Sequence, residues 1–168
     1  NGINIPDAPF SVSDHKNIIR FCFVGRLAKS KGLEDFIEAI EIIEKNKFKV
    51  SALIAGYRNE GKLDYFDSSF YEKINAKHNI EFLNEIEHSK ILSIYKPGDV
   101  FVLPSYSEGL PKAALEAASI SIPLILTNIS GCSECVDGNG FLVEKENPDD
   151  LAKKMLKFIE NPDSVITM

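Results

Sequence analysis

Two acidic residues, Glu108 and Glu116, flank a short turn that offers hydrogen-bond donors to an anion. The apolar run at 99–104 (DVFVLP) predicts a buried strand, and Pro111 stands where proline suits the first turn of a helix. A strand, a turn and a helix in this order leave free backbone N–H groups and the positive end of a helix dipole at one edge. The segment is therefore a candidate site for an anionic ligand, with two carboxylates beside it.

The surroundings of Glu116 allow two interpretations. Its neighbours are small and apolar, and they predict a helix that packs closely against another element: Ala113, Ala114, Leu115, Ala117, Ala118 and Ile120. A carboxylate buried there needs hydrogen-bond donors, because an unpaired buried charge is costly, and a ligand with hydroxyl groups would supply them. Alternatively, Glu116 lies on a solvated stripe and pairs with Lys112, a contact worth at most about 0.5 kcal/mol. Glu108 also has a simpler explanation, as a favourable charge near a helix N-terminus.

Two cations, Arg26 and Lys31, lie in a glycine-flanked loop at 25–32 (GRLAKSKG) that follows an apolar run. Helical spacing of apolar residues begins directly after this loop. A loop between a strand and a helix can hold phosphate groups through its backbone N–H groups and cationic side chains. Basic residues in loops are also often only solvated, and we expect this of Lys29. Arg58 is either a further phosphate contact or, as is usual for arginine, a surface residue.

The elements that position these residues alternate along the chain. Continuous apolar runs predict six strands, at 18–24, 48–55, 80–83, 99–104, 122–126 and 138–143. Helical spacing lies between them, including 65–77 and 91–95, and Asn147 followed by Pro148 predicts the start of a last helix. Strands that are apolar throughout belong to a sheet covered on both faces. We therefore predict an α/β fold with a doubly wound, mainly parallel, Rossmann-like sheet of about six strands, whose ligand lies at the C-terminal edge.

Composition and charge exclude several other classes of protein. The net charge is −6 and the sequence has no basic block, which argues against a nucleic-acid partner. No apolar run reaches the length of a membrane span, and no signal peptide is visible. The cysteines are Cys22, which we place in the core, and one C-x-x-C pair, Cys132 and Cys135. Zinc usually takes four ligands, so we expect no metal and interpret these residues as reduced cytoplasmic thiols.

Several short motifs occur in an order that resembles one enzyme family. The motifs are G-R-L-x-x-x-K-G at 25–32, Ser105–Glu108–Gly109–Leu110–Pro111, Leu115–Glu116–Ala117 and Pro123. Together they resemble the signature of the retaining glycosyltransferases of family 4, the group 1 glycosyl transferases. The resemblance extends over nearly the whole chain, and it implies one half of the two-domain GT-B architecture.

The resemblance implies a role for each matching residue. Arg26 and Lys31 would neutralise the diphosphate of a nucleotide-sugar donor, Glu108 would face the donor sugar and Glu116 the ribose. The catalytic residues would then be Arg26, Lys31 and Glu108. The residues that bind the donor would be Gly25, Gly56, Ile86, Gly109, Leu110, Pro111 and Glu116. The family's reaction transfers the sugar to an acceptor hydroxyl with retention at the anomeric carbon, and it implies no metal and no other cofactor.

The same resemblance divides the chain into two parts. We expect residues 1–17 to be an interdomain linker or lead-in and residues 18–168 to be the nucleotide-sugar donor-binding domain. Because the chain begins at Asn1 rather than methionine, we expect it to be a piece of a longer protein. An N-terminal domain would then bind the acceptor, a glycan or a lipid-linked sugar. We expect a cytoplasmic protein, with any peripheral contact to a membrane made through that missing domain.

Three departures from the family pattern leave alternatives open. Cys132 and Ser121 replace glycines, and the loop after Gly56 reaches its next glycine only at Gly61. A non-catalytic module of the same fold, which binds a nucleotide or mediates assembly, is therefore one alternative. Another is a related two-domain enzyme, such as a nucleotide-sugar epimerase or a phosphorylase. A phosphorylase would need a lysine that holds pyridoxal phosphate, and no motif in the sequence indicates one.

Overall fold

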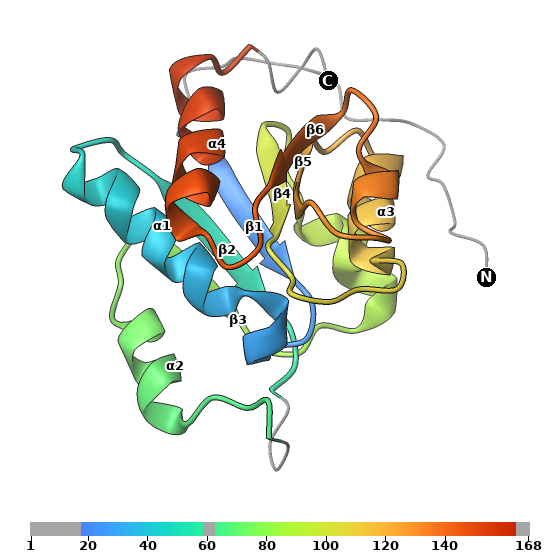
Figure 1. Cartoon of the computed structure of the whole chain (residues 1–168). Coiled ribbons are helices and arrows are strands. Elements are labelled where there is room, and N and C mark those ends of the chain that lie inside the picture. Colours follow the sequence, from blue (N-terminus) through green and yellow to red (C-terminus); the bar gives the residue numbers. More distant parts are fainter. Residues whose placement is uncertain (1–17, 59–62, 164–168) are drawn as a thin grey trace.

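A computed structural model describes residues 18–58 and 63–163, which form a parallel sheet covered by helices (Figure 1). The predicted linker at 1–17 lies outside the described residues. In the described part the sheet has six strands in the order β3-β2-β1-β4-β5-β6, and every neighbouring pair is parallel. The strands are β1 (Arg20–Val24), β2 (Ser51–Ala55), β3 (Ile80–Leu83), β4 (Asp99–Leu103), β5 (Leu124–Thr127) and β6 (Gly140–Val143). The prediction of a doubly wound, Rossmann-like α/β fold is confirmed.

The helices lie on both faces of this sheet. They are α1 (Leu33–Lys45), α2 (Ser68–Asn75), α3 (Lys112–Ser119) and α4 (Pro148–Glu160), with short 3₁₀ turns η1 (Lys29–Lys31), η2 (His88–Ile94) and η3 (Ser133–Cys135). The chain steps from β1 to β2 in one direction across the sheet and from β4 to β5 in the other. Since such crossovers are right-handed, α1 and α3 cover opposite faces. Helix α4 returns to lie beside α1 (Figure 1).

The neighbouring strands β1 and β4 therefore form the point where the direction of the connections reverses. In an open parallel sheet this reversal leaves a crevice at the C-terminal ends of the strands, because the two following loops diverge. Strand β4 is buried along its whole length, and Cys22 in β1 is part of the core, as predicted. At the opposite ends of the same strands, Arg20 Nη2 contacts Asp99 Oδ2 at 2.6 Å. This ion pair helps to fix β1 against β4.

Helix starts follow the capping chemistry of the sequence, with one shift from the prediction. The Asn147 side chain accepts a hydrogen bond from Asp150 N at 2.9 Å, and Pro148 opens α4, as predicted. The helix predicted at 65–77 begins only at Ser68, because the Asp67 side chain accepts from the backbone N–H of Phe70 and makes Asp67 the cap. Its aromatic spacing is helical, but the cap sets the start.

Other elements also differ from the predicted pattern, and β1, β5 and β6 each begin two residues later than predicted. Strand β2 begins at Ser51 rather than residue 48, because Phe48 N donates to Ile43 O at 3.2 Å and so completes the end of α1. The helical spacing near 91–95 forms the 3₁₀ turn η2 rather than an α-helix. This turn ends just before Tyr95, ahead of the Pro97–Gly98 pair.

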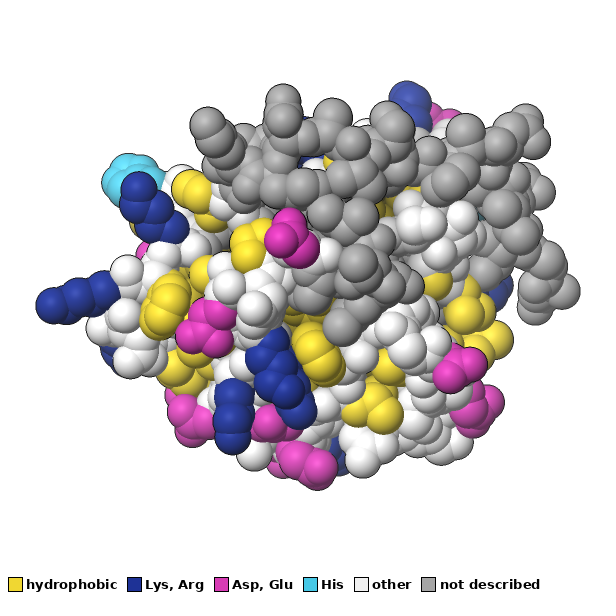
Figure 2. Space-filling model, turned by 90° about the horizontal axis from the view of Figure 1, so that it is seen from above, with side chains coloured by type: hydrophobic (Ala, Val, Ile, Leu, Met, Phe, Trp, Pro, Cys, Tyr) yellow, Lys and Arg dark blue, Asp and Glu magenta, His cyan; other side chains and the backbone are white. Residues whose placement is uncertain are grey.

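Figure 2 views the molecule from the end at which the strands begin, opposite the end that carries their C-termini. Among the described residues on this face, basic and acidic side chains are interspersed rather than gathered by sign (Figure 2). Nucleic-acid binding needs a broad basic surface, and the described part of this face does not present one.

Candidate functional site

A cavity of about 470 Å³ opens where β1 and β2 end. Its lining comes from the loops after β1, β2 and β3, from η2 and from α3: Val24, Gly25, Arg26, Ala55, Gly56, Tyr57, Glu85, Ile86, Glu87, His88, Ile91 and Ala113. Four residues singled out in the sequence, Gly25, Arg26, Gly56 and Ile86, are among them. The cavity lies at the C-terminal edge of the sheet, where the fold predicts a ligand.

Close backbone contact shapes one wall of this cavity. Gly25 N donates to Ala55 O at 3.0 Å, and a Cβ atom added to Gly56 would lie 1.7 Å from Gly25 O. Any side chain at Gly56 would therefore force the two loops apart. Gly61, the next glycine after Gly56 in the sequence, lies outside the described residues.

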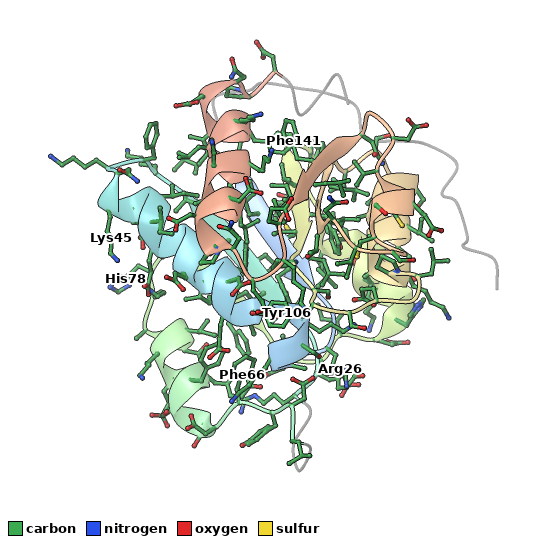
Figure 3. The ribbon with its side chains drawn as sticks, viewed as in Figure 1. Arg26, Lys45, Phe66, His78, Tyr106 and Phe141 are labelled. Atoms are coloured by element: carbon green, nitrogen blue, oxygen red, sulfur yellow. The ribbon has the colours of Figure 1, made fainter. Side chains whose placement is uncertain are left out.

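Arg26 is half-buried and stands at the lower end of the sheet in Figure 3, where β1 ends. It lines the cavity, so its guanidinium supplies positive charge at this edge. Arg58 does not extend this charge into the site, because its guanidinium stacks on the Tyr71 ring at 4.2 Å from the centroid. Lys29 is exposed, with its ammonium 6.0 Å from the Phe66 ring, which confirms it as a surface residue.

Lys31 and Glu108, which are far apart in the sequence, form an ion pair. Lys31 Nζ lies 2.6 Å from Glu108 Oε1, and the hydroxyl of Ser105 donates to the same oxygen at 2.9 Å. The side chains of Lys31 and Glu108 are only 17% and 12% exposed. A close contact brings the two segments together, since a Cβ atom at Gly32 would lie 2.0 Å from Pro104 O. Neither residue of the pair lines the cavity. Lys31 lies in the segment after β1, and Glu108 lies in the segment after the adjacent strand β4.

Asp64, which the sequence patterns did not single out, holds the loop that carries Lys31. Its carboxylate accepts hydrogen bonds from Ser30 N at 2.8 Å and from Ser30 Oγ, and its carbonyl accepts from Lys29 N. Partial burial would raise the pKa of Asp64, but the bonds from Ser30 and the charge of Arg26 outweigh it and lower that pKa. No local motif marks such a residue, because its partner lies 34 positions away.

Glu116 is buried, with 8% of the residue exposed. Its Oε1 lies 3.1 Å from Nε2 of His88, which opens η2, and Lys112 is exposed. The alternative of a solvated stripe that pairs with Lys112 is therefore wrong. Glu116 is not part of the cavity lining, but its contact His88 and its α3 neighbour Ala113 are. Sequence reasoning missed His88, and only its position just after Ile86 signalled a place near the site.

The turn before α3 carries the remaining predicted residues. Gly109 and Leu110 are exposed, and Pro111 is the buried N-cap rather than the first helical residue. Gly131 packs closely against this turn. Its φ is +84°, and an added Cβ atom would lie 1.9 Å from Gly109 O. A side chain at Gly131 would push against the turn that holds Glu108. None of Gly109, Leu110 and Pro111 belongs to the cavity lining.

The described residues contain no cluster of three or more His, Cys, Asp or Glu side chains that could hold a metal ion. Cys132 and Cys135 are buried and unpaired by disulfides. Burial, together with the negative charge of Glu108, raises the pKa of the Cys132 thiol to about 12. No helix in the described ranges has the length and apolar character needed to cross a membrane.

The chain is a Rossmann-like domain with a cavity at the C-terminal edge of its sheet, and the comparisons with known proteins give its family. The family model of glycosyl transferases group 1 matches residues 6–166, so the chain belongs to this family. An uncharacterized glycosyltransferase of Methanocaldococcus jannaschii is 38% identical over 141 residues, which are 83% of this chain and 38% of that protein. The capsular polysaccharide biosynthesis glycosyltransferase CapM of Staphylococcus aureus is 30% identical over 142 residues, 83% of this chain and 36% of CapM.

Solved structures show the same fold. The C-terminal domain of a group 1 glycosyl transferase from Francisella tularensis is 28% identical, with a TM-score of 0.73 over 88% of this chain and 78% of that one. Anabaena HepE, solved with UDP and glucose, has a TM-score of 0.77 over 90% of this chain and 41% of its own, at 23% identity. The chain spans somewhat more than a third of the length of the curated relatives named above.

Proposed function

We propose that this chain is the donor-binding half of a retaining glycosyltransferase that moves a sugar from a nucleotide-diphosphate sugar to an acceptor hydroxyl. The observation that carries this proposal is the buried carboxylate of Glu116, which contacts His88 in the lining of a cavity at the C-terminal edge of the sheet. A buried carboxylate suits a ligand with hydroxyl groups, which donate the hydrogen bonds that water would otherwise supply. The ribose of a nucleotide has such groups.

The nucleoside fits the cavity by size and by chemistry. A volume of about 470 Å³ lies within the range typical of small-molecule sites. Ile86 and Ala113 give the cavity an apolar wall for a base, and Glu116 on α3 accepts from the ribose. The backbone of the loop at Ile86 then lies beside the base.

The diphosphate and the sugar extend toward Arg26 and the Lys31–Glu108 pair. Negative charge develops on the leaving diphosphate in the transition state, and fixed cations stabilise it there. In the free protein Glu108 holds Lys31 in place at 2.6 Å. When the donor binds, Lys31 turns its charge to a phosphate oxygen, and Glu108 accepts from a sugar hydroxyl. The backbone N–H groups of Gly109 and Leu110 help to hold the donor.

The named relatives support this class of substrate. CapM takes its name from capsular polysaccharide biosynthesis, and the HepE structure contains UDP and glucose. For this protein we infer a glycan or lipid-linked sugar as the acceptor, bound by a further domain across the cleft. Transfer needs no metal in this scheme, because Arg26 and Lys31 provide the positive charge. We infer a cytoplasmic protein that reaches the membrane, if its acceptor is lipid-linked, through that further domain.

Calorimetric titration with UDP, GDP and ADP in the presence of a metal chelator tests the proposal. We expect saturable binding of one nucleotide, and at least about tenfold weaker binding by Arg26→Ala and Glu116→Ala, since each removes a charge-assisted contact. Lys29→Ala is the matched control, because Lys29 lies in the same loop as Arg26 but is exposed. Equal affinity in folded Arg26→Ala and Glu116→Ala, or an equal loss in Lys29→Ala, would contradict the proposed roles.

A further inference from the structure

His88 lies on the rim of the cavity and contacts the carboxylate proposed to bind the ribose. Its side chain is 82% exposed, whereas that of Glu116 is 10% exposed, and the two meet at 3.1 Å between Nε2 and Oε1. We propose that His88 is a positioning residue that orients Glu116 and thereby sets the preference of the site for ribose over 2′-deoxyribose. This inference rests on the proposed function.

Glu116 needs such a partner because of where it stands. Its neighbours on α3 are small and apolar, and Ala114 and Ala117 are fully buried. Those side chains donate no hydrogen bonds. His88 Nε2 lies 3.1 Å from Oε1 and restrains that oxygen from the cavity side, which favours one orientation of the carboxylate toward the ligand. Without it, the three side-chain torsions of a glutamate leave several orientations open.

The other charged groups near His88 do not compete for its ring. Glu87, the adjacent residue, pairs with Lys90 at 3.0 Å. Glu85 and Arg26 also line the cavity, and in the part of the chain that the structure describes the ion-pair contact of His88 is with Glu116 rather than with Glu85. The geometry therefore ties His88 to the carboxylate of Glu116 rather than to its own segment.

An oriented carboxylate gives specificity as well as affinity. A site built to accept hydrogen bonds from a hydroxyl discriminates strongly against an analogue that lacks it, because a buried acceptor is then left unpaired. A carboxylate with Oε1 fixed by His88 presents a defined pair of oxygens to the ribose hydroxyls. A carboxylate free to turn can adapt to a single hydroxyl. Loss of His88 should therefore weaken binding of the ribonucleotide more than binding of its 2′-deoxy counterpart.

The test compares UDP, GDP or ADP, whichever the chain binds, with the same nucleotide lacking the 2′-hydroxyl. Affinities are measured by calorimetry for wild type, His88→Ala and His88→Gln, with His78→Ala as a control at another exposed histidine. We expect His88→Ala to lower the ratio of ribo to deoxy affinity by about fivefold or more, and His78→Ala to leave it unchanged. The side-chain amide of glutamine is a donor at a similar distance from the backbone as Nε2 of histidine. His88→Gln should therefore restore most of the ratio of ribo to deoxy affinity.

The outcomes separate this inference from the proposal beneath it. An unchanged ratio in His88→Ala, with circular dichroism showing a native fold, would overturn the inference while nucleotide binding stands. An equal loss of both affinities would do the same, because it would make His88 a general support of the loop. Absence of nucleotide binding by the wild-type chain would instead overturn the proposed function, and the inference with it.

Discussion

At the scale of single residues, Glu108 and Glu116 owe their surroundings to distant parts of the chain. Glu108 meets Lys31, which is 77 positions away, and Glu116 meets His88 from η2. Each carboxylate therefore has a partner within the protein. Under the proposed function these side chains are positioned before the donor binds, which lowers the entropy that binding must cost.

Ser121 adopts a backbone conformation that favours glycine. It follows the last turn of α3 with φ of +62°, Ser121 N donates to Ala118 O, and Ile122 N donates to Ala117 O. This is the Schellman arrangement, in which a left-handed residue ends the helix. A side chain in that region costs about 1 kcal/mol.

We therefore expect Ser121→Gly to raise the free energy of unfolding by about 0.5–1 kcal/mol. Urea denaturation monitored by circular dichroism measures the change. Ser119→Gly is the control, because Ser119 lies inside α3 and glycine there should destabilise the chain. Equal or lower stability of Ser121→Gly would show that the left-handed residue carries no strain.

The residue types of the site were open to prediction from the sequence, but their partners were not. The spacing of Glu108 and Glu116, and the loop with Arg26 and Lys31, stand in local patterns. The burial of Glu116 followed from its small neighbours as one of two interpretations. The contact with His88 depends on how η2 packs against α3, which no local pattern fixes.

At the scale of elements, the loop with Arg26 and Lys31 depends on a segment after β2. Asp64 accepts from both the backbone and the hydroxyl of Ser30, and so holds the η1 turn. The close contact of Gly32 with the backbone of Pro104 also restrains this turn. Two tertiary contacts, rather than the sequence of the turn itself, thus hold the backbone on either side of Lys31.

Asp64 makes a pH-dependent contribution to stability. Its folded pKa lies below its unfolded pKa, so the ionised form is favoured by folding. The contribution is complete above the unfolded pKa of about 4 and is lost as the pH falls through the folded pKa. We expect wild type to be more stable than Asp64→Asn at pH 7, with a difference that narrows below about pH 4.

Urea denaturation of both proteins across this pH range checks that expectation. Asp67→Asn is the comparison. Asp67 is also a hydrogen-bonded acid, but it caps α2, whereas Asp64 holds the loop that carries Arg26 and Lys31. Of the two variants, only Asp64→Asn should also weaken nucleotide binding. A difference between wild type and Asp64→Asn that stays constant with pH would contradict the role of the ionised carboxylate.

The order of strands and helices was predictable because apolar runs and helical spacing are local signals. The predicted boundaries were wrong where a single side chain or a helix end sets the start of an element. Asp67 delays α2, and the end of α1 at Phe48 delays β2. The 3₁₀ form of η2 was also missed, since three apolar residues at helical spacing do not distinguish it from an α-helix.

At the scale of the whole molecule, the parallel strand order explains why the candidate residues gather. Arg26, Ile86 and Glu116 come from loops or helices that follow β1, β3 and β4. Because all strands run in one direction, these segments meet at one edge. The chain also covers little more than a third of the length of the relatives named above.

A second hollow, of about 310 Å³, offers a built-in comparison for the location of ligand binding. It lies between the η1 turn and α2 and is lined in part by Lys29, Phe66 and Lys73. It contains aromatic and basic side chains, as a nucleotide site often does. Its lining contains none of Gly25, Arg26 and Ile86, so the proposed function places no ligand there.

The measurement that tests the central claim most directly is an amide NMR titration of the ¹⁵N-labelled chain with the nucleotide that calorimetry selects. We predict that the largest shifts fall at the cavity edge, in 25–26, 56–57 and 85–88, and at the start of α3. Amides at the opposite edge, near Arg20 and Asp99, should move little. Shifts centred on Phe66 and α2, or no saturable shifts from a folded chain, would contradict a donor site at the C-terminal edge of the sheet.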